Sequence, residues 1–339
     1  MAIDYRNLGA NGVKVSPLCL GALMFGDRTD EADSHAIVAH ARDAGINFID
    51  TADSYVGGGS EEVVGRAIAS DRQHWILATK LGNPAGPGPN QRGLSRQWVM
   101  NACEASLRRL GTDHIDVYYL HKEDHATPLE ETVLAMGDLI RAGKIRSFGV
   151  SNHRAWRIAE ICNLCDGYGI PRPSVSQPYY NAMNRMPEVE QLPACDYYGL
   201  GVAPYSPLAR GVLSGKYRPG ADPAADTRAG QGDKRMLETE WRSESLEIAQ
   251  TLKVHAEERG ISAGQFAVAW LLNNQLVTSV IAGPRTMAQW TDYLGALDYD
   301  FTAEDEALVN DLVVAGHPST PGFNDPAYPI EGRVPLTGE

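Results

Sequence analysis

Polar residues recur along this chain at intervals that match one strand and one helix, each at the end of a short apolar segment. An interval of this length holds a loop, a crossover helix and the next parallel strand. Eight such repeats predict a (β/α)8 TIM barrel, whose chemistry lies at the carboxyl ends of its strands. The polar residues, separated by 30, 41, 30, 26 and 28 positions, are Asp50, Lys80, His121, Ser151, Gln177 and Tyr205.

Eight segments have the residue types of buried strands, and amphipathic segments separate them. Strands are expected near residues 18–21, 46–50, 75–80, 115–121, 146–151, 174–177, 200–205 and 277–282. Helices are expected near residues 31–44, 60–69, 95–110 and 128–142. Ahead of the first of these strands, Asn11-Gly12 predicts a β-hairpin. An open doubly wound sheet is the alternative, but Gly21-Ala22-Leu23-Met24 is not the glycine-rich fingerprint that would follow its first strand.

Two long irregular segments are expected on the active face of a single domain that spans residues 1–339. One is a loop at about 208–240, which is rich in Gly, Pro, Ala and Asp between residues 218 and 233 and is typical of a mobile loop. The other is a tail at about 316–339, which contains five prolines together with Phe323 and Tyr328. Two interpretations of the tail stay open, a packed or disordered end and a wall of the substrate pocket.

Composition limits the partners of the protein. The 339 residues carry a formal net charge of -13, which disfavours nucleic acids and anionic membranes because the overall field repels phosphate. Any phosphate site must therefore be local. Five cysteines and no signal-like amino terminus predict a cytoplasmic protein, and the lone Cys162-Asn163-Leu164-Cys165 lacks the further ligands of a zinc site. No apolar run approaches the roughly 20 residues that cross a bilayer.

The stretch from Ile46 to Tyr55 is typical of a buried strand whose carboxyl end carries the polar residues of a pocket. A free phenol has a pKa of about 10, so Tyr55 needs help to act as an acid. A lysine such as Lys80 would lower that pKa, Asp50 would keep the lysine charged, and His121 would orient a carbonyl oxygen. Such a group suits a carbonyl that accepts hydride, because negative charge develops on its oxygen.

The neighbouring acidic residues have simpler interpretations. Asp53 is expected to cap a loop. Glu61 and Glu62 are expected to form the solvated start of a helix, where carboxylates complement the helix dipole.

Several motifs make nearly the whole chain resemble the aldo-keto reductases of the bacterial type. The longest is Gly45-Ile46-Asn47-Phe48-Ile49-Asp50-Thr51-Ala52-Asp53-Ser54-Tyr55, followed by Gly59-Ser60-Glu61. Further matches are Ala78-Thr79-Lys80, the run from Leu110 to His121, the run from Gly143 to Asn152, and Tyr205-Ser206-Pro207-Leu208 with the run from Gly211 to Tyr217.

The resemblance implies a barrel that reduces aldehydes or ketones with an extended nicotinamide cofactor. It implies Tyr55 as the acid, Lys80 and Asp50 as the pair that tunes it, and His121 as the orienting residue. It also implies that Ser151, Asn152 and Gln177 bind the carboxamide and that Tyr205 stacks on the ring. The cofactor site would further include Gly21, Met24, Asp50, Ser206, Pro207, Leu208 and Gly211.

The cofactor phosphates need cations, for which Lys216 and Arg285 are the candidates. The run from Gly211 to Lys216 is not a P-loop, because three residues rather than four separate its glycines and Tyr217 follows the lysine. The resemblance places the segment 207–217 along the pyrophosphate, and Gly283, Arg285 and Gln289 around a 2'-phosphate. An arginine there favours NADPH over NADH. Asp292-Tyr293 departs from the Glu-Asn of many relatives, so Tyr293 is expected to stack on adenine.

The substrate is predicted to be a small-molecule aldehyde or ketone, without nucleic acid or membrane as a partner. Its predicted contacts are Met24, Phe25, Tyr55, His121 and Asn152, with Asn83, Trp241 and Tyr328 as further candidates. The resemblance also covers channel β-subunits, so a nicotinamide-binding regulatory subunit with weak catalytic activity is the alternative function. A metal-dependent barrel hydrolase or isomerase is disfavoured, because His and carboxylate ligands do not cluster at the strand ends. The sequence does not indicate an oligomeric state.

Overall fold

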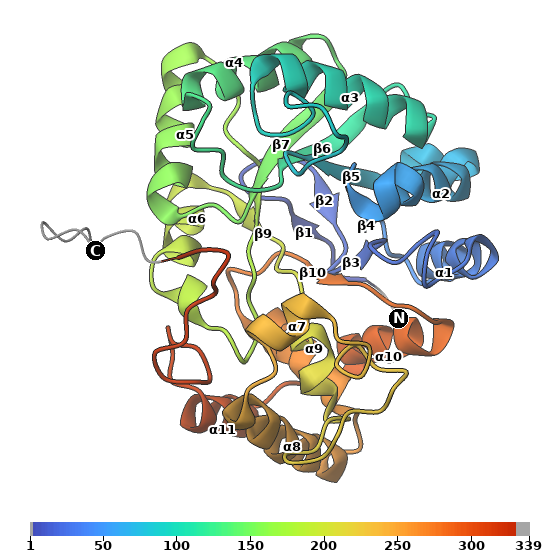
Figure 1. The fold of residues 1–339 in the computed structure, drawn as a ribbon, viewed down its shortest axis with the longest axis vertical. Helices are drawn as coiled ribbons and strands as arrows, with labels where there is room; N and C mark the ends of the chain where they lie inside the picture. Colours follow the sequence, from blue (N-terminus) through green and yellow to red (C-terminus); the bar gives the residue numbers. More distant parts are fainter. Residues whose placement is uncertain (1–2, 330–339) are drawn as a thin grey trace, which may run out of the picture.

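A curled sheet of eight parallel strands forms the centre of the protein, and the computed structural model describes residues 3–329 (Figure 1). The strand order follows the chain, except that the last strand lies beside the first. In chain order, the strands are β3 (Leu18–Gly21), β4 (Phe48–Asp50), β5 (Ile76–Leu81), β6 (Ile115–Leu120), β7 (Ile145–Ser151), β8 (Val175–Gln177), β9 (Gly201–Val202) and β10 (Val280–Ala282).

Backbone hydrogen bonds close the curl between β9 and β10. The amide of Thr278 donates to the carbonyl of Val202 at 2.8 Å, and the amide of Ile281 donates to the carbonyl of Pro204 at 3.0 Å. The predicted (β/α)8 barrel is therefore confirmed. The strands are shorter than expected at several ends, and β9 ends at Val202 although the amides of Ala203 and Tyr205 still donate to the carbonyls of Ser176 and Pro178.

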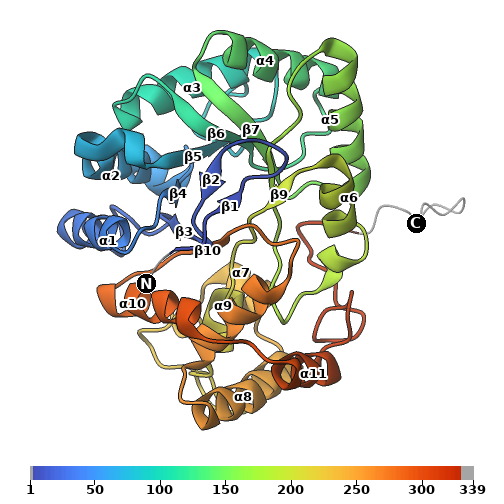
Figure 2. The same cartoon turned by 180° about the vertical axis from the view of Figure 1, so that it is seen from behind.

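Helices cover the outside of the sheet, and successive strands are joined through them (Figures 1 and 2). The four predicted helices are confirmed to within one residue or two at their ends. The helices are α1 (Glu31–Asp43), α2 (Gly59–Ile68), α3 (Arg96–Leu110), α4 (Leu129–Arg141), α5 (Ala155–Tyr168), α6 (Gln191–Tyr198), α7 (Lys234–Thr239), α8 (Ser243–Glu258), α9 (Ala263–Asn273), α10 (Met287–Gly295) and α11 (Ala303–Leu312).

Alternating side chains divide the apolar core into two parts. Cys19, Phe48 and Ala78 belong to a small cluster inside the barrel, whereas their neighbours Leu18 and Ile49 belong to the larger cluster that includes the buried faces of the helices. This alternation follows from the two-residue period of a strand. It leaves the polar residues at the strand ends as the lining of the open face.

The predicted hairpin is confirmed and closes the other end of the barrel. β1 (Arg6–Asn7) pairs antiparallel with β2 (Lys14–Val15), and Figure 2 shows the hairpin across the centre of the sheet. Leu8 and Val15 of this hairpin pack into the inner core. The left-handed residue of the connection is Gly9 (φ 69°), where a Cβ would lie 2.4 Å from the carbonyl oxygen of Ser174.

The five cysteines are buried free thiols. Burial raises the pKa of Cys162 and Cys165 to about 12, which makes them poor nucleophiles and poor metal ligands at neutral pH. Within residues 3–329, no helix combines the length and apolar character that crossing a membrane requires.

Candidate active site

A buried lysine joins the carboxyl ends of β4 and β5. The ammonium of Lys80, which is fully buried, donates to Asp50 Oδ2 at 2.5 Å, to the carbonyl of Thr51 at 2.7 Å and to the hydroxyl of Tyr55 at 3.1 Å. The ammonium also lies 4.6 Å from the centre of the Tyr55 ring. Two of the predicted catalytic residues, Asp50 and Tyr55, therefore contact a third, Lys80, directly.

Local backbone geometry turns Tyr55 back towards this lysine. The amide of Tyr55 donates to the carbonyl of Ala52 at 3.2 Å, and a short 3-10 turn, η1 (Tyr55–Gly58), follows. Val56 at φ 52° and Gly58 at φ 99° have left-handed conformations in this turn. For Val56 such a conformation is strained, and strain of this kind concentrates at functional sites.

His121 completes the predicted group on the opposite side of Tyr55. The two ring centres are 5.8 Å apart in an edge-on arrangement. Burial, together with the charges of Lys80 and Lys122, holds the pKa of His121 well below its usual value, so the imidazole is neutral. The amide nitrogen of Asn83 lies 3.1 Å from Nδ1. Because Nδ1 accepts this hydrogen bond, the ring proton resides on Nε2.

Burial has a larger effect on the pKa of Tyr55 than the sequence suggested. It raises the pKa of the phenol, and Lys80 opposes this rise without reversing it. Lys80 therefore lowers the pKa of Tyr55 as predicted, but by less than burial raises it. Asp50 and Tyr55 in turn raise the pKa of Lys80 despite its burial, so the lysine stays charged. The site thus holds a protonated phenol beside a fixed ammonium.

Polar side chains from β7 and β8 extend this network. Gln177 donates to Asp50 Oδ1 at 3.0 Å, and the Ser151 hydroxyl donates to the carbonyl of Gln177 at 2.9 Å. Asn152 donates to Ser151 Oγ at 3.0 Å and accepts from the Tyr205 hydroxyl at 2.8 Å. These contacts hold the predicted carboxamide-binding residues rigidly at the edge of the sheet.

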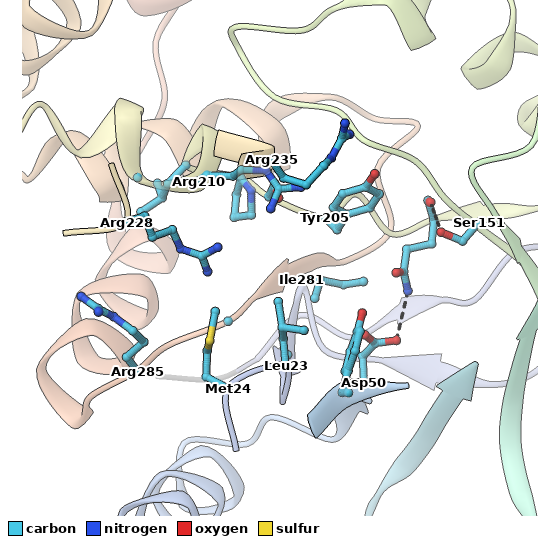
Figure 3. Close-up of a pocket in the computed structure, with 18 of the residues that line it drawn as sticks. Leu23, Met24, Asp50, Ser151, Tyr205, Arg210, Arg228, Arg235, Ile281 and Arg285 are labelled. Atoms are coloured by element: carbon cyan, nitrogen blue, oxygen red, sulfur yellow. Dashed lines mark hydrogen bonds between the residues drawn. The ribbon is translucent and has the colours of Figure 1, made fainter. Parts of the chain in front are cut away.

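A cavity of about 500 Å³ lies over this face of the barrel (Figure 3). Asp50, Tyr55 and His121 line it, with Lys80 beneath them. The structure also brings every predicted cofactor-binding residue to its lining, namely Gly21, Met24, Asp50, Ser151, Asn152, Gln177, Tyr205, Ser206, Pro207, Leu208, Gly211, Lys216, Gly283, Arg285, Gln289 and Tyr293.

One end of the cavity is cationic, although the chain as a whole is acidic. Figure 3 shows Arg228 and Arg285 at this end and Asp50 at the other. Partial burial, followed by the charges of Arg285 and Arg228, lowers the pKa of Lys216, which places these three cations near one another. The cavity is thus suited to an elongated ligand with phosphates at one end.

Two of the predicted substrate candidates lie away from the cavity. Phe25 is fully buried in the larger apolar cluster between the sheet and the helices. Leu23, two residues earlier, lines the cavity instead. The prediction that Phe25 contacts the substrate is therefore corrected. β3 ends at Gly21, and the turn that follows directs Leu23 and Met24 towards the cavity. Trp241 packs against the core and the ring of Tyr217. Asn83 and Tyr328 do line the cavity.

The tail forms part of the wall as far as residue 329. Tyr328 lines the cavity, and Asp325 accepts two hydrogen bonds from Arg235 at 2.9 and 2.6 Å. Arg154 also donates to the carbonyl of Pro329 at 2.9 Å. The pocket-wall interpretation therefore holds for this part, while residues 330–339 lie outside the described residues.

Sequence reasoning missed three arginines that line the cavity: Arg210, Arg228 and Arg235. All three come from the segment 208–240, which contains a 3-10 turn, η4 (Ala209–Ser214), and α7. The signal that could have identified them is their charge. Several arginines in one loop of an otherwise acidic chain indicate a local anion site.

Glu61 and Asp53 are buried near Lys80, and the prediction of a solvated Glu61 was wrong. Glu61 is fully buried, accepting from Thr79 Oγ1 and from Arg109 Nε, each at 2.6 Å, whereas Glu62 is exposed as predicted. The Asp53 carboxylate is also buried, and its side-chain oxygens lack a well-formed hydrogen bond among the described residues, although the Ser54 backbone amide acts on it. Burial and the charge of Glu61 raise the pKa of Asp53 to about 7, against the opposing charges of Arg109 and Lys80.

We expect Asp53→Asn to stabilise the protein increasingly as the pH rises. The folded state holds the Asp53 proton up to about pH 7, whereas the unfolded chain releases it at about pH 4. Wild-type stability is therefore lost across this window as pH rises, and the neutral Asn avoids that loss. Denaturant unfolding at about pH 5 and pH 8 should show the advantage of the variant grow by roughly 2–4 kcal/mol. The exposed Asp222→Asn is the matched control, and a constant difference would contradict the prediction.

Among residues 3–329, no three His, Cys, Asp or Glu side chains gather in an arrangement that could hold a metal ion.

Comparisons with known proteins agree with this geometry. The family model described as "Aldo/keto reductase family" matches residues 17–313. A probable voltage-gated potassium channel subunit beta of Arabidopsis thaliana is 38% identical over 87% of this chain and 92% of its own length. The uncharacterized oxidoreductase YrpG of Bacillus subtilis is 34% identical over 94% of this chain and 98% of its own. L-glyceraldehyde 3-phosphate reductase of Escherichia coli K12 is 32% identical, covering 93% of each chain.

Proposed function

The chain belongs to the aldo/keto reductase family and is an NAD(P)H-dependent oxidoreductase, and we propose that it uses NADPH to reduce an aldehyde or ketone to the alcohol, with Tyr55 as the proton donor. The observation that carries this proposal is the contact of the Tyr55 hydroxyl with the buried Lys80 ammonium at 3.1 Å, on the wall of a cavity with a cationic end. We also propose that the protein is cytoplasmic and acts as a single domain.

The side chains divide the reaction between them. The Nε2 hydrogen of neutral His121 binds the substrate carbonyl oxygen and positions it beside the Tyr55 hydroxyl. Tyr55 gives its proton to this oxygen as negative charge develops there, and the Lys80 ammonium stabilises the phenolate that remains. Asp50 holds Lys80 in place and charged. The nicotinamide cofactor, when bound, supplies the hydride.

The residues present fit such a cofactor. Lys216, Arg228 and Arg285 offer cations for its phosphates. Tyr205, whose ring centre lies 5.6 Å from that of Tyr179, offers an aromatic surface for a ring, and Ser151 and Gln177 offer hydrogen-bonding groups for an amide.

A panel of aldehydes and ketones tests the proposal directly. Purified protein is mixed with NADPH and each compound, and the loss of cofactor absorbance is followed. We expect NADPH oxidation that depends on both protein and carbonyl compound. The alcohol product, identified by mass spectrometry, excludes simple cofactor breakdown.

A second function, a nicotinamide-binding regulatory subunit, is favoured by one observation. The Arabidopsis relative at 38% identity is described as a channel subunit. A protein that binds NADPH but oxidises it with no member of the panel would support this alternative and contradict the first.

We expect Arg285→Ala to weaken NADPH binding roughly 10- to 100-fold while changing NADH binding by less than about threefold. The reason is that a 2'-phosphate, which only NADPH carries, would lose its guanidinium partner. Dissociation constants are measured by quenching of protein fluorescence with each cofactor. Arg218→Ala, an exposed arginine that does not line the cavity, is the control for the loss of one positive charge. Equal weakening for both cofactors would remove the 2'-phosphate role.

A further inference from the structure

Arg210 occupies a backbone position that suits glycine better than arginine. It lies in η4 with a φ of 52°, and the next residue, Gly211, also has a positive φ. A residue with a Cβ is strained in this region, whereas glycine adopts it freely. Asn152 and Ser206, which also line the cavity, share this feature. Strain at the position therefore accompanies a long cationic side chain that reaches the cavity wall, which indicates a function for that side chain.

The guanidinium of Arg210 is only partly neutralised. Its Nε lies 3.7 Å from Glu240 Oε1, beyond hydrogen-bond distance, and has no hydrogen-bond partner in the described part of the chain. Glu240 is fully buried and accepts a hydrogen bond from the Tyr179 hydroxyl. The charge of Arg242 also acts on Glu240. Glu240 thus interacts with two guanidiniums, and the charge of Arg210 also acts on Asp325.

Arg210 lies between the two ends of the cavity, and after burial its charge is the main cause that lowers the pKa of Arg228 at the cationic end. Burial raises the pKa of Tyr55, Tyr205 and Tyr328, and the Arg210 charge is among those that oppose this rise. Figure 3 shows Arg210 and Arg235 along the side of the cavity that carries Tyr205, between the Arg228 end and the Asp50 end.

Apart from Lys122, which follows His121, the other cations of the lining have partners or another role. Arg235 donates two hydrogen bonds to Asp325 at 2.9 and 2.6 Å. Lys216, Arg228 and Arg285 form the cationic end proposed for the cofactor phosphates. Arg210 lines the cavity, and among the described residues Glu240, at 3.7 Å, is the only carboxylate within ion-pair distance of its guanidinium.

We propose that Arg210 binds a negatively charged group on the carbonyl substrate, so that the preferred substrates are anionic aldehydes or ketones. This inference rests on the proposed reductase function. A phosphate monoester or a carboxylate a few bonds from the carbonyl supplies the same chemistry, an oxyanion that accepts hydrogen bonds from a guanidinium. When no substrate is bound, Glu240 holds the Arg210 side chain near the position in which it would bind the anion.

The test compares two matched pairs of substrates, glyceraldehyde with glyceraldehyde 3-phosphate and butanal with succinic semialdehyde. We expect wild-type kcat/KM to favour the anionic member of at least one pair, and the pair with the larger ratio identifies phosphate or carboxylate. In Arg210→Gly this ratio should fall roughly 10- to 100-fold, mainly through KM. Glycine relieves the strain but removes the cation beside the buried Glu240, so the Tm and circular dichroism spectrum of the variant are measured to separate lost activity from misfolding. Arg218→Gly is the control for charge on the same loop.

Binding measurements separate this role from a cofactor role. With NADP+ present, calorimetric titration of glycerol 3-phosphate or 4-hydroxybutyrate should detect affinity in the wild type and a matching loss in Arg210→Gly. An equal loss for anionic and neutral substrates, accompanied by weaker NADPH binding, would place Arg210 on the cofactor and overturn the inference. A wild type that reduces carbonyl compounds without preferring anions would overturn it while leaving the proposed function intact. A complete absence of NADPH oxidation would overturn both.

Discussion

Tyr55→Phe should lower kcat for carbonyl reduction by roughly 10²- to 10⁴-fold, because it removes the proton that the developing alkoxide needs. The ring, its packing and the position of Lys80 remain, so we expect NADPH to bind with a dissociation constant within about twofold of the wild type. Stopped-flow measurement of NADPH oxidation and fluorescence titration of NADPH check the two halves of this result.

Two comparisons make the Tyr55 result specific. Tyr197→Phe removes the hydroxyl of a tyrosine that is 81% exposed, and it should leave kcat unchanged. The raised pKa of Tyr55 also means that the donor stays protonated through the neutral range, so wild-type kcat should not fall between about pH 6 and pH 9 through loss of this proton. Undiminished turnover in Tyr55→Phe would transfer the role of acid to another group.

The barrel and the meeting of the proposed catalytic residues were predictable because both follow from short-range patterns. A parallel strand and its crossover helix need a nearly constant length of chain, so Asp50 and Lys80, 30 residues apart, must end neighbouring strands. The carboxyl ends of parallel strands meet on one face, which brings Ser151 and Gln177 into register as well. The sequence therefore contained the topology and the direction of these side chains.

The parts that escaped prediction depend on contacts between distant segments. The partner of Glu61 is Arg109 on the next helix, and no local pattern shows that this ion pair is buried. Asp53 lies beside that pair, so its burial was equally hidden. Arg210 and Arg228 belong to a loop whose path is set by packing rather than by periodicity. The prediction that Phe25 contacts the substrate was wrong for a related reason. The turn after β3 decides which of several apolar residues faces the cavity.

Lys80→Met should cost about 3–5 kcal/mol of stability at neutral pH and at least roughly 100-fold in kcat. The substitution preserves the length and apolar stem of the side chain but leaves the buried Asp50 with Gln177 as its remaining side-chain hydrogen-bond donor. An unpaired buried carboxylate is unfavourable until it takes up a proton, so the stability deficit should shrink as the pH is lowered to about 5. Urea unfolding across this range checks the prediction.

Adding Asp50→Asn to Lys80→Met separates the structural role of the pair from its chemical role. The double variant has no buried charge at this position, and it should recover most of the lost stability because removing both members of a buried ion pair costs far less than removing one. It should not recover kcat, because the phenolate that Tyr55 becomes would still lack the ammonium that stabilises it. Recovery of both properties would mean that Lys80 serves only to neutralise Asp50, whereas recovery of neither would mean that its bond to the Thr51 carbonyl, 2.7 Å long, holds the strand ends together.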